Sequence, residues 1–205
     1  MTLTIDGYEV PAEGSLLDAV LAAGIDLPHL CKDDNLPAIG ACRTCLVEAD
    51  GRIVASCSLP ASSVKNVSTT SERARRIRRG VLELTAAMLT PIDAPGGPLS
   101  KTTREAFVRE SAGESRFRRR DRTVTDASNS FFAFAEGACI LCGRCVTACQ
   151  DLQHISAIGL AGRGVATRVT PGGGDSFRES ICTSCGSCVA ACPTNALAPK
   201  TGGMR

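Results

Sequence analysis

Two eleven-residue stretches of this 205-residue chain place cysteines at the same spacing. CILCGRCVTAC runs from Cys139 to Cys149, and CTSCGSCVAAC runs from Cys182 to Cys192. The stretches are identical at seven of eleven positions, and in each the cysteines are separated by two, two and three residues. A spacing that is repeated so closely predicts two related sites that bind a ligand through several thiolates.

Cysteines at two-two-three spacing that end in Cys-Pro form the ligand set of a 4Fe–4S cluster. The first three wrap a tight loop around one face of the cluster, and Gly143 and Gly186 let backbone N–H groups approach its sulfur atoms. The fourth cysteine ligates the other cluster, and we expect a helix to start there. One predicted cluster is bound by Cys139, Cys142, Cys145 and Cys192, and the other by Cys182, Cys185, Cys188 and Cys149.

The two stretches differ in the residue that follows the fourth cysteine. Pro193 follows Cys192, but Gln150 follows Cys149. Because the proline is not a ligand, the assignment is kept. Zinc is the alternative metal, but zinc sites usually take two ligand pairs separated by a longer loop. Duplicated runs of four cysteines fit that pattern poorly, so the spacing favours two 4Fe–4S clusters.

The remaining four cysteines, Cys31, Cys42, Cys45 and Cys57, are separated by ten, two and eleven residues. Plant-type 2Fe–2S ferredoxins have Cys-x4-Cys-x2-Cys and a distant fourth cysteine. The first gap is longer here, so the spacing alone leaves zinc open. Gly40 gives the loop the permissive backbone that a cluster needs. The twelve cysteines thus divide into three sets of four, and none remains for nucleophilic catalysis.

The elements around this third set are predicted from local patterns. Residues 3–10 alternate about Asp6-Gly7 and predict a β-hairpin, which Pro11 ends. Ser15 is placed to cap a short helix that Gly24 ends.

A second hairpin is expected over residues 45–57 about Asp50-Gly51. The order hairpin, helix, ligand loop, hairpin looks like a β-grasp ferredoxin domain, which favours 2Fe–2S at the third set.

The pattern changes after residue 70. Four apolar residues recur at helical spacing among arginines: Ile77, Val81, Leu84 and Met88. Ser71 is the expected N-cap, and Pro91 marks the expected end. Residues 91–100 are rich in proline and glycine and predict a loop, and an arginine-rich connector follows over residues 114–130.

An α+β chain with four regions is therefore expected. They are a β-grasp 2Fe–2S domain (1–70), a helix with its connector (71–137), a double 4Fe–4S domain like that of bacterial ferredoxins (138–198) and a flexible tail (199–205).

Charge and hydropathy limit the class of protein. The chain has 23 Lys and Arg against 21 Asp and Glu, a formal net charge of +2. This balance disfavours nucleic-acid binding, so the arginine runs at 73–79 and 116–122 are interpreted as solvated faces or as partners of an acidic subunit. No secretory signal is visible, and no stretch has the roughly 18 apolar residues of a membrane span. We expect a cytoplasmic chain with reduced thiols.

The order of these parts resembles a known family. LCKDDNLPAIGACRTCLVE, the helix RRIRRGVLELTAAML and the double cysteine segment are similar to the N-terminal electron-transfer region of NAD-dependent formate dehydrogenase α subunits. Iron–iron hydrogenases and the large iron–sulfur subunit of respiratory complex I share this region. The small diaphorase-side subunit of NAD-reducing nickel–iron hydrogenases also resembles the chain, and it is a separate polypeptide of similar length.

Two departures from the resemblance change what it implies. The family commonly has another 4Fe–4S site with one His and three Cys, but LTPIDAPGGPLSKTTREAF contains neither residue. We expect that cluster to be missing. In formate dehydrogenases and iron–iron hydrogenases a catalytic domain follows in the same chain, whereas this chain ends at Arg205. The resemblance then implies that the catalytic site lies on another polypeptide.

The leading hypothesis is an electron-transfer subunit of a soluble NAD(P)-linked oxidoreductase, of formate dehydrogenase or hydrogenase type. It would connect a flavin/NAD(P)-binding iron–sulfur subunit to a catalytic subunit that holds molybdenum, tungsten or nickel–iron. No flavin, NAD or catalytic residue is assigned to this chain, and His154 is interpreted as a surface or packing residue. A free-standing polyferredoxin-like carrier is the alternative, although such carriers tend to be small and strongly acidic.

Overall fold

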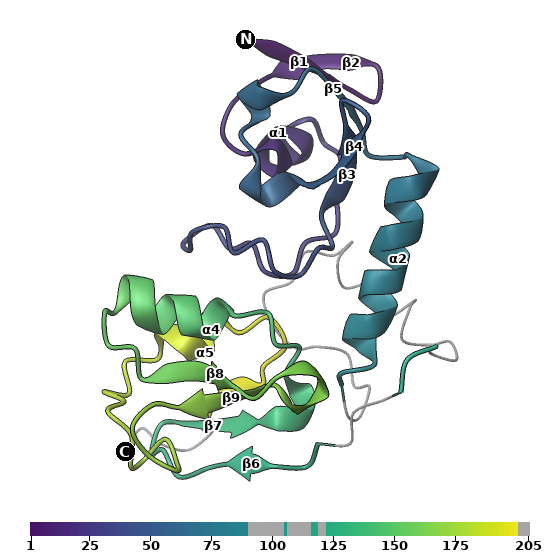
Figure 1. The fold of residues 1–205 in the computed structure, drawn as a ribbon. Helices are drawn as coiled ribbons and strands as arrows, with labels where there is room; N and C mark the ends of the chain where they lie inside the picture. The colour runs from purple at the N-terminus through teal and green to yellow at the C-terminus, as the bar shows by residue number, and fades with distance from the viewer. Residues whose placement is uncertain (90–104, 106–115, 119–121, 201–205) are drawn as a thin grey trace. The chain divides into compact units, whose positions relative to one another are not determined.

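The computed structural model describes residues 1–89, 105, 116–118 and 122–200, and it contains two compact units (Figure 1). Among these residues, the first unit holds 1–32, 38–84, 105 and 116, and the second holds 33–37, 85–89, 117–118 and 122–200. The predicted loop over residues 91–100, and with it Pro91, lies outside the described residues, as do 201–205 of the predicted tail.

The first unit is built on a five-stranded sheet in the order β2-β1-β5-β3-β4. Its strands are β1 (Thr2–Ile5), β2 (Tyr8–Pro11), β3 (Leu46–Ala49), β4 (Arg52–Ala55) and β5 (Asn66–Ser68). β1 pairs with β5 in parallel, and the other neighbours pair antiparallel. Both predicted hairpins are confirmed. Their Asp-Gly turns have positive φ at both residues, 47° and 91° in the first and 45° and 76° in the second.

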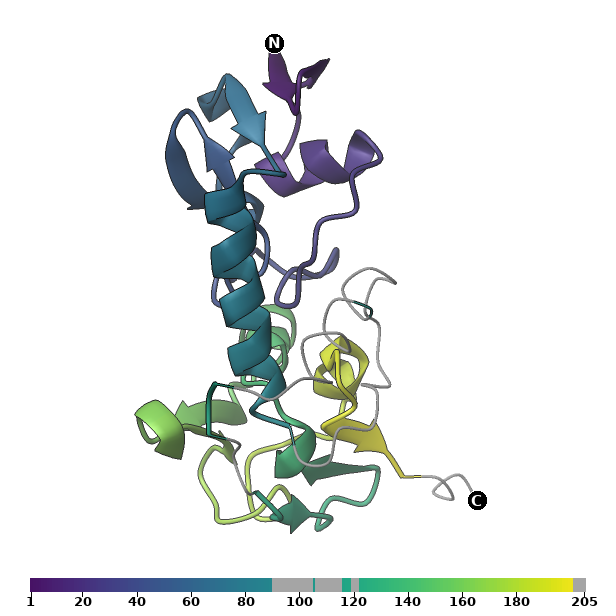
Figure 2. The same cartoon turned by 90° about the vertical axis from the view of Figure 1, so that its right-hand side faces the viewer.

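Helix α1 (Leu16–Ala22) packs its apolar face on this sheet (Figure 2). Ser15 is the N-cap, as predicted: its hydroxyl accepts from the Asp18 N–H at 3.2 Å, and the Asp18 carboxylate accepts from the Ser15 N–H at 3.0 Å. This reciprocal pair satisfies two N–H groups at the start of the helix. Leu16, Leu17 and Val20 are fully buried in the core of the unit.

Helix α2 (Glu72–Ala86) is present where the sequence predicts a helix, but its buried face is different. Leu84 is 42% exposed, whereas Ala74 and Leu82 are buried. Arg78 explains the difference. Its guanidinium donates to the carbonyls of Leu46 and Thr69 at 2.6 and 2.8 Å and so fixes the rotation of the helix about its axis.

The expected N-cap of α2 is only partly correct. The Ser71 carbonyl accepts from the Arg75 N–H at 2.9 Å, as at a helix start, but the Ser71 hydroxyl donates to the carboxylate of Glu48. Two 3-10 turns follow β4 in the first unit: η1 (Ser56–Ser58), which contains Cys57, and η2 (Ala61–Ser63).

The second unit contains a three-stranded sheet in the order β10-β7-β6 and a separate β8–β9 hairpin. Its elements are β6 (Thr125–Asp126), β7 (Phe132–Ala135), η3 (Glu136–Ala138), α4 (Arg144–Thr147), η4 (Ala148–Leu152), β8 (Ile158–Ala161), η5 (Gly164–Ala166), β9 (Arg168–Pro171), α5 (Ser187–Ala191) and β10 (Leu197–Pro199). Phe177 packs edge-on against Phe132 and Phe134, with ring centroids 5.2 and 6.2 Å apart. The expected α+β architecture is confirmed.

One expectation about the cysteine loops is wrong. The fourth cysteine of each stretch does not start a helix. Cys192 directly follows α5, and Cys149 lies in η4, a π-helical turn that continues α4. The reason is the spacing itself. Four positions separate Cys188 from Cys192, as they do Cys145 from Cys149, and four positions make about one helical turn. The turn therefore has to begin near the third cysteine.

Within the described residues, no helix has the length and apolar character needed to cross a membrane.

Candidate iron–sulfur centres

The first candidate centre is formed by Cys31, Cys42, Cys45 and Cys57, all in the first unit. The β3–β4 hairpin brings two of them together, since Leu46, directly after Cys45, pairs with Ala55, which lies two residues before Cys57. The Ser56 hydroxyl donates to the Cys45 carbonyl at 2.8 Å and ties the two ends of the hairpin together. Cys31, Cys45 and Cys57 are buried, and Cys42 is half-buried.

The sulfur atoms of this centre lie within hydrogen-bonding reach of one another. Hydrogen bonds from the thiols of Cys42 and Cys57 lower the pKa of Cys31 to about 2, and a hydrogen bond from the Cys57 thiol lowers the pKa of Cys45 to about 6. The same contacts raise the pKa of Cys42 and of Cys57. The four thiols therefore form one connected group, and it is the thiolate form of such cysteines that binds iron.

The loop that carries Cys42 has the backbone of a cluster-binding loop. Gly40 and Arg43 have φ of 68° and 57°, and the Cys42 N–H donates to Cys31 Sγ at 3.5 Å. Thr44 is fully buried and its hydroxyl lies 3.1 Å from Cys42 Sγ. The sequence motifs missed Thr44, which adds a polar contact to a sulfur atom that would otherwise face the protein interior.

The eight remaining cysteines line two separate cavities in the second unit. One cavity is lined by Cys139, Cys142, Cys145 and Cys192 together with Phe134, Leu141 and Leu197. The other is lined by Cys149, Cys182, Cys185 and Cys188 together with Phe132 and Ile158. Each cavity combines three cysteines of one stretch with the fourth cysteine of the other. This is the crossed grouping expected from the sequence.

The electrostatic neighbours of the third cysteines follow the same grouping. Burial raises the pKa of the Cys145 thiol, and the negative charges of Cys142 and Cys139, with smaller effects of Cys192 and Cys188, raise it further. Burial, together with the charges of Cys182, Cys185 and Cys149, raises the pKa of Cys188 to about 12. Burial and the neighbouring cysteines therefore disfavour a negative charge on the two third cysteines, which would bind a metal as thiolates.

The two cavities share one backbone design. Leu141 and Ser184, two residues after the first cysteine of each stretch, have φ of 53° and 57°, and their N–H groups donate to Cys139 Sγ and Cys182 Sγ at 3.4 Å. Gly143 and Gly186 follow with φ of 84° and 81° and start the two helices. An N–H group also points at each fourth cysteine, from Ala157 to Cys149 Sγ at 3.2 Å and from Leu197 to Cys192 Sγ at 3.4 Å.

The missing proline after Cys149 has a structural counterpart. The N–H donor to Cys192 lies five residues later, but the donor to Cys149 lies eight residues later. The extra residues form η4 and an exposed loop in which His154 and Ser156 have positive φ. His154 is exposed on this loop and does not line either cavity.

Residues outside the motifs also hold the cysteine loops in place. The buried Asn129 donates to the Ser184 hydroxyl at 2.9 Å and accepts from the Phe131 N–H at 2.9 Å. The Thr194 hydroxyl donates to the Ala138 carbonyl at 2.7 Å, next to Cys139. Asn129 is 55 positions from its partner, so no local pattern could have identified it.

Arg144 distinguishes the first stretch from the second, which has Ser187 at the equivalent position. Its side chain is 3% exposed and forms an ion pair with Asp33, which belongs to the same unit. Leu36 packs with Ala148 and Ala191 in a small apolar cluster. The segment 33–37 thus packs on the helical turns that carry the cysteines of the second unit.

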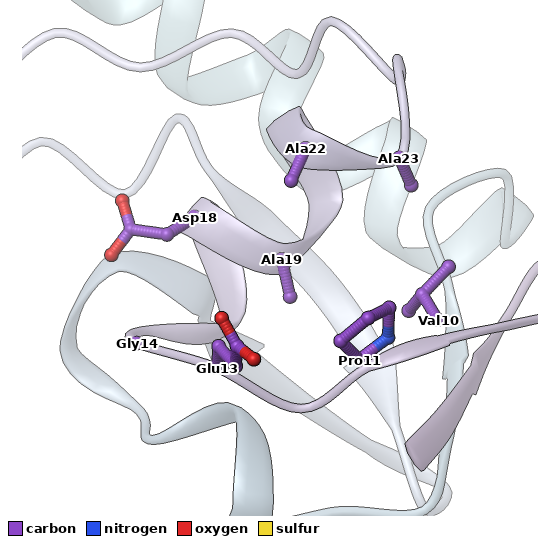
Figure 3. Close-up of a pocket in the computed structure, with 8 residues that line it drawn as sticks. All are labelled: Val10, Pro11, Glu13, Gly14, Asp18, Ala19, Ala22 and Ala23. Atoms are coloured by element: carbon purple, nitrogen blue, oxygen red, sulfur yellow. The ribbon is translucent and has the colours of Figure 1, made fainter.

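A third cavity lies at the surface of the first unit between the end of β2 and α1 (Figure 3). It is lined by Val10, Pro11, Glu13, Gly14, Asp18, Ala19, Ala22 and Ala23, and it contains none of the cysteines. Asp18 is engaged in the capping pair and in an ion pair with Lys32 at 3.3 Å. In the described part of the chain, no group of three or more His, Cys, Asp or Glu side chains is arranged to hold a single metal ion.

Comparison with known families agrees with the two cysteine modules. Residues 1–72 match the 2Fe-2S iron-sulfur cluster binding domain, and residues 138–196 match the 4Fe-4S dicluster domain. The predicted pairing of a 2Fe–2S domain with a 4Fe–4S dicluster domain is therefore confirmed.

Curated relatives are longer chains that align with most of this one. A subunit of the NADH-quinone oxidoreductase of Rickettsia prowazekii is 33% identical over 177 residues, which are 82% of this chain and 26% of the relative. The mitochondrial NADH dehydrogenase [ubiquinone] iron-sulfur protein 1 of Solanum tuberosum is 31% identical over 169 residues, 78% of this chain and 22% of the relative. The chain thus spans about a quarter of the length of these relatives.

A solved structure resembles nearly the whole chain. A chain in the crystal structure of an NAD+-reducing [NiFe]-hydrogenase in the H2-reduced state aligns with a TM-score of 0.82 and 32% identity, covering 99% of this chain and 88% of that one. The predicted resemblance to iron–sulfur subunits of complex I and of NAD-reducing hydrogenases is confirmed. This chain belongs to the same family of iron–sulfur electron-transfer subunits of NADH-linked oxidoreductases.

Proposed function

We propose that this chain relays single electrons through one 2Fe–2S and two 4Fe–4S clusters, between a flavin/NAD(P)(H)-binding subunit and a separate catalytic subunit of formate dehydrogenase or hydrogenase type. The observation that carries the proposal is the pair of cavities that gather the eight cysteines into two crossed sets of four. Structural zinc sites do not require two cysteine loops to exchange their fourth ligand, whereas paired 4Fe–4S clusters do.

The ligands follow from these groups. The 2Fe–2S cluster is assigned to Cys31, Cys42, Cys45 and Cys57. One 4Fe–4S cluster is assigned to Cys139, Cys142, Cys145 and Cys192, and the other to Cys182, Cys185, Cys188 and Cys149. When bound, such clusters accept and release one electron at a time.

The contribution of the protein is to hold the ligands and adjust the potentials. Backbone N–H groups directed at cysteine sulfur atoms stabilise negative charge on the sulfur, which favours the reduced cluster. Apolar residues such as Phe134 and Ile158 in the cavity walls exclude water and so also affect the potential. We assign no catalytic acid, base or nucleophile to this chain, and His154 lines neither cavity.

The proposed partners come from the relatives. One of them is named as a subunit of NADH-quinone oxidoreductase, and the structural neighbour belongs to an NAD+-reducing [NiFe]-hydrogenase. A protein of this family takes electrons from, or gives them to, the NAD(H) side of a complex, so a flavin-bearing subunit is the expected neighbour on one side. Molybdenum, tungsten or nickel–iron is the expected metal of the catalytic subunit on the other.

The test is native purification of the tagged chain from its own host, followed by mass spectrometry and by analysis of iron and acid-labile sulfide. We expect about ten iron and about ten sulfide ions per chain. Stoichiometric recovery of a flavin subunit and a metal-bearing catalytic subunit supports the relay. Recovery of the chain alone, with the clusters intact and reversibly reduced, favours the free-standing carrier instead. Zinc with about six irons or fewer contradicts the cluster assignment.

A further inference from the structure

The two cysteine loops of the second unit share one backbone but differ in exposure. Cys142 of the first loop is half-buried, whereas Cys185 at the equivalent position of the second loop is exposed. The glutamates three residues before each loop differ in the same way. Glu136 is 8% exposed, whereas Glu179 is exposed and accepts from the Ser176 hydroxyl at 3.2 Å. A buried carboxylate therefore precedes the first loop but not the second, and burial makes its charge costly unless it is paired.

Arg122, the last residue of the arginine run at 116–122, is the partner of Glu136. The two side chains form an ion pair and are 13% and 10% exposed. The same guanidinium donates to the carbonyls of Val165 and Thr167 at 2.9 and 2.7 Å. The Glu136 N–H donates to the Val124 carbonyl at 3.0 Å, which holds the two segments together through the backbone as well. Arg122 thus binds groups within its own unit, in contrast to the solvated face expected for the run.

The contacts of Arg122 lead to two walls of one cavity. Glu136 begins η3, and its carbonyl accepts from the Cys139 N–H at 3.0 Å, so the ion pair fixes the turn that enters the first cysteine loop. Thr167 directly precedes β9, and the buried Val169 of that strand lines the cavity that contains Cys139. One guanidinium therefore holds both the start of the cysteine loop and the strand that packs against its cavity.

The pair also balances the charge beside this cavity. Among the described residues of the second unit, Glu136 and Arg144 are the charged residues that are buried, and Arg144 has its own partner in Asp33. Arg163 and Arg168 on the β8–β9 hairpin are exposed, so water and salt screen their charges. Three residues separate Glu136 from the first cysteine of its stretch, which places the two Cα atoms at most about 11 Å apart. At such a separation an unpaired charge affects the energy of adding an electron.

We propose that Arg122 is a positioning residue for the 4Fe–4S centre of the first cavity, and that its charge prevents the buried Glu136 carboxylate from lowering the reduction potential of that cluster. The cysteines of this centre are Cys139, Cys142, Cys145 and Cys192. The inference rests on the proposed function and deepens it by naming a charge pair that acts on one of two clusters with nearly the same loop. A reduced cluster carries one more negative charge, so an unpaired carboxylate nearby disfavours reduction.

The first test is a redox titration of the full-length chain with its clusters, followed by electron paramagnetic resonance. It is run at about pH 8.5, where a carboxylate that has lost its partner stays ionised. In Arg122→Gln, we expect the ratio of reduced to oxidised first cluster at a fixed ambient potential to fall about tenfold. In Glu136→Gln the guanidinium is left unpaired, and the ratio should rise by a similar factor. The double variant should return the ratio towards that of the unmodified chain.

Two further variants serve as controls for the titration. Glu179→Gln removes a carboxylate at the equivalent position before the second loop, where it is exposed, and we expect both clusters to be unchanged. Cys142→Ser identifies which redox component belongs to the first cluster, because Cys142 lines that cavity and not the other.

The second test separates position from charge. Lysine keeps the positive charge of Arg122, but its single nitrogen cannot reproduce the fork that bonds a carboxylate and two carbonyls. We expect Arg122→Lys to leave the reduction ratio within about twofold of the unmodified value, because the charge is retained. Amide hydrogen exchange in β9 should become about tenfold faster, while exchange in β1 of the first unit stays the same. Arg122→Gln should show both the altered ratio and the faster exchange.

Three results would overturn the proposal. They are a shift in the same direction in both single variants, a response of the second cluster alone, and exchange in β9 that Arg122→Lys leaves unchanged. If Arg122→Gln loses the first cluster, Glu136→Gln and Arg122→Lys decide, since the raised ratio and the faster exchange must still be seen. A failure of the proposed function is distinguishable, because the unmodified chain would then lack iron and sulfide or hold clusters that cannot be reduced.

Discussion

At the scale of single residues, the candidate centres depend on contacts to sulfur. Backbone N–H groups donate to the sulfur atoms of several cysteines, among them Cys31, Cys139, Cys149, Cys182 and Cys192. Of all substitutions only proline removes a backbone N–H donor, and its fixed φ would also disturb the loop. Single substitutions therefore test the ligands more directly than they test the donors.

Cys42→Ser is expected to remove the 2Fe–2S cluster and leave both 4Fe–4S clusters. The hydroxyl is a poorer iron ligand than a thiolate, and Cys42 is linked to the other three sulfur atoms through Cys31. Electron paramagnetic resonance of the reduced protein should lose the 2Fe–2S signal, and the iron content should fall by about two per chain.

Cys142→Ser is the matched control, since it should affect a 4Fe–4S signal and leave the 2Fe–2S signal. An unchanged 2Fe–2S signal in Cys42→Ser would show that Cys42 is not a ligand of that cluster.

Asp6 makes a contact that depends on pH. Its carboxylate accepts from the Thr69 N–H at 2.8 Å and from the Thr69 hydroxyl, which joins the first turn to the end of β5. Burial acts to raise the pKa of Asp6, but these hydrogen bonds outweigh it and hold the pKa below its ordinary value. Because the pKa of Asp6 is lower in the folded state, the contact stabilises the fold fully at pH values above the unfolded-state pKa of about 3.9. This stabilisation is lost as the pH falls through the folded-state pKa.

Asp6→Asn is therefore expected to destabilise the chain by about 1 kcal/mol at pH 7, while asparagine still tolerates the left-handed turn. The deficit relative to the unmodified chain should be constant from about pH 8 to pH 5 and shrink below about pH 4. Urea unfolding followed by circular dichroism measures this loss of stability. Glu9→Gln, at an exposed position on β2, is the control, and we expect its urea midpoint to be unchanged. A deficit that does not change at lower pH would mean that the carboxylate charge is not responsible.

At the scale of elements, each cysteine loop leads into its helix through a glycine in the left-handed region. Gly186 has φ of 81°, and a Cβ added there would meet no atom within 4 Å. Gly186 also lines the second cysteine cavity, so substitution at this position tests the left-handed backbone together with the room beside the candidate cluster.

Gly186→Ala is expected to strain the loop by about 1 kcal/mol and to lower the occupancy of the adjacent 4Fe–4S cluster when iron is limiting. Gly159→Ala in β8 is the matched control, because its added Cβ also meets no atom and its φ is not in the left-handed region. Iron content after reconstitution compares the two variants. Equal occupancy in both would show that the left-handed glycine is not needed.

At the scale of the whole molecule, the two units differ in what holds them together. The core of the first unit is made mainly of aliphatic residues from α1 and the sheet. The core of the second unit includes Cys145, Cys149, Cys188 and Cys192. A fold whose core consists partly of metal ligands gains its stability from the metal.

Removal of the clusters with a chelator and an oxidant is expected to loosen the second unit far more than the first. Amide hydrogen exchange followed by mass spectrometry should show loss of protection in β7 and α5 and retained protection in β1 and β3. The untreated protein is the control. Equal loss in both units would mean that the first unit depends on its cluster as strongly as the second depends on its own.

The sequence alone determined both hairpins, the cap at Ser15 and the α+β class, and it predicted the three cysteine sets. These features depend on chemistry within a few residues: an Asp-Gly pair favours a two-residue turn, and a hydroxyl three residues before a carboxylate can form a capping pair. The cysteine spacing is likewise local, because one tight loop has to surround a cluster face.

Only the tertiary structure decided the rotation of α2, the helical turns that end at the fourth cysteines, the role of Asn129 and the unequal exposure of the two cysteine loops. Each depends on partners far away in the chain, as Arg78 does on the carbonyl of Leu46 and Asn129 on Ser184. Two loops of nearly the same sequence can be buried or exposed, because burial is set by what packs against them and not by their own residues.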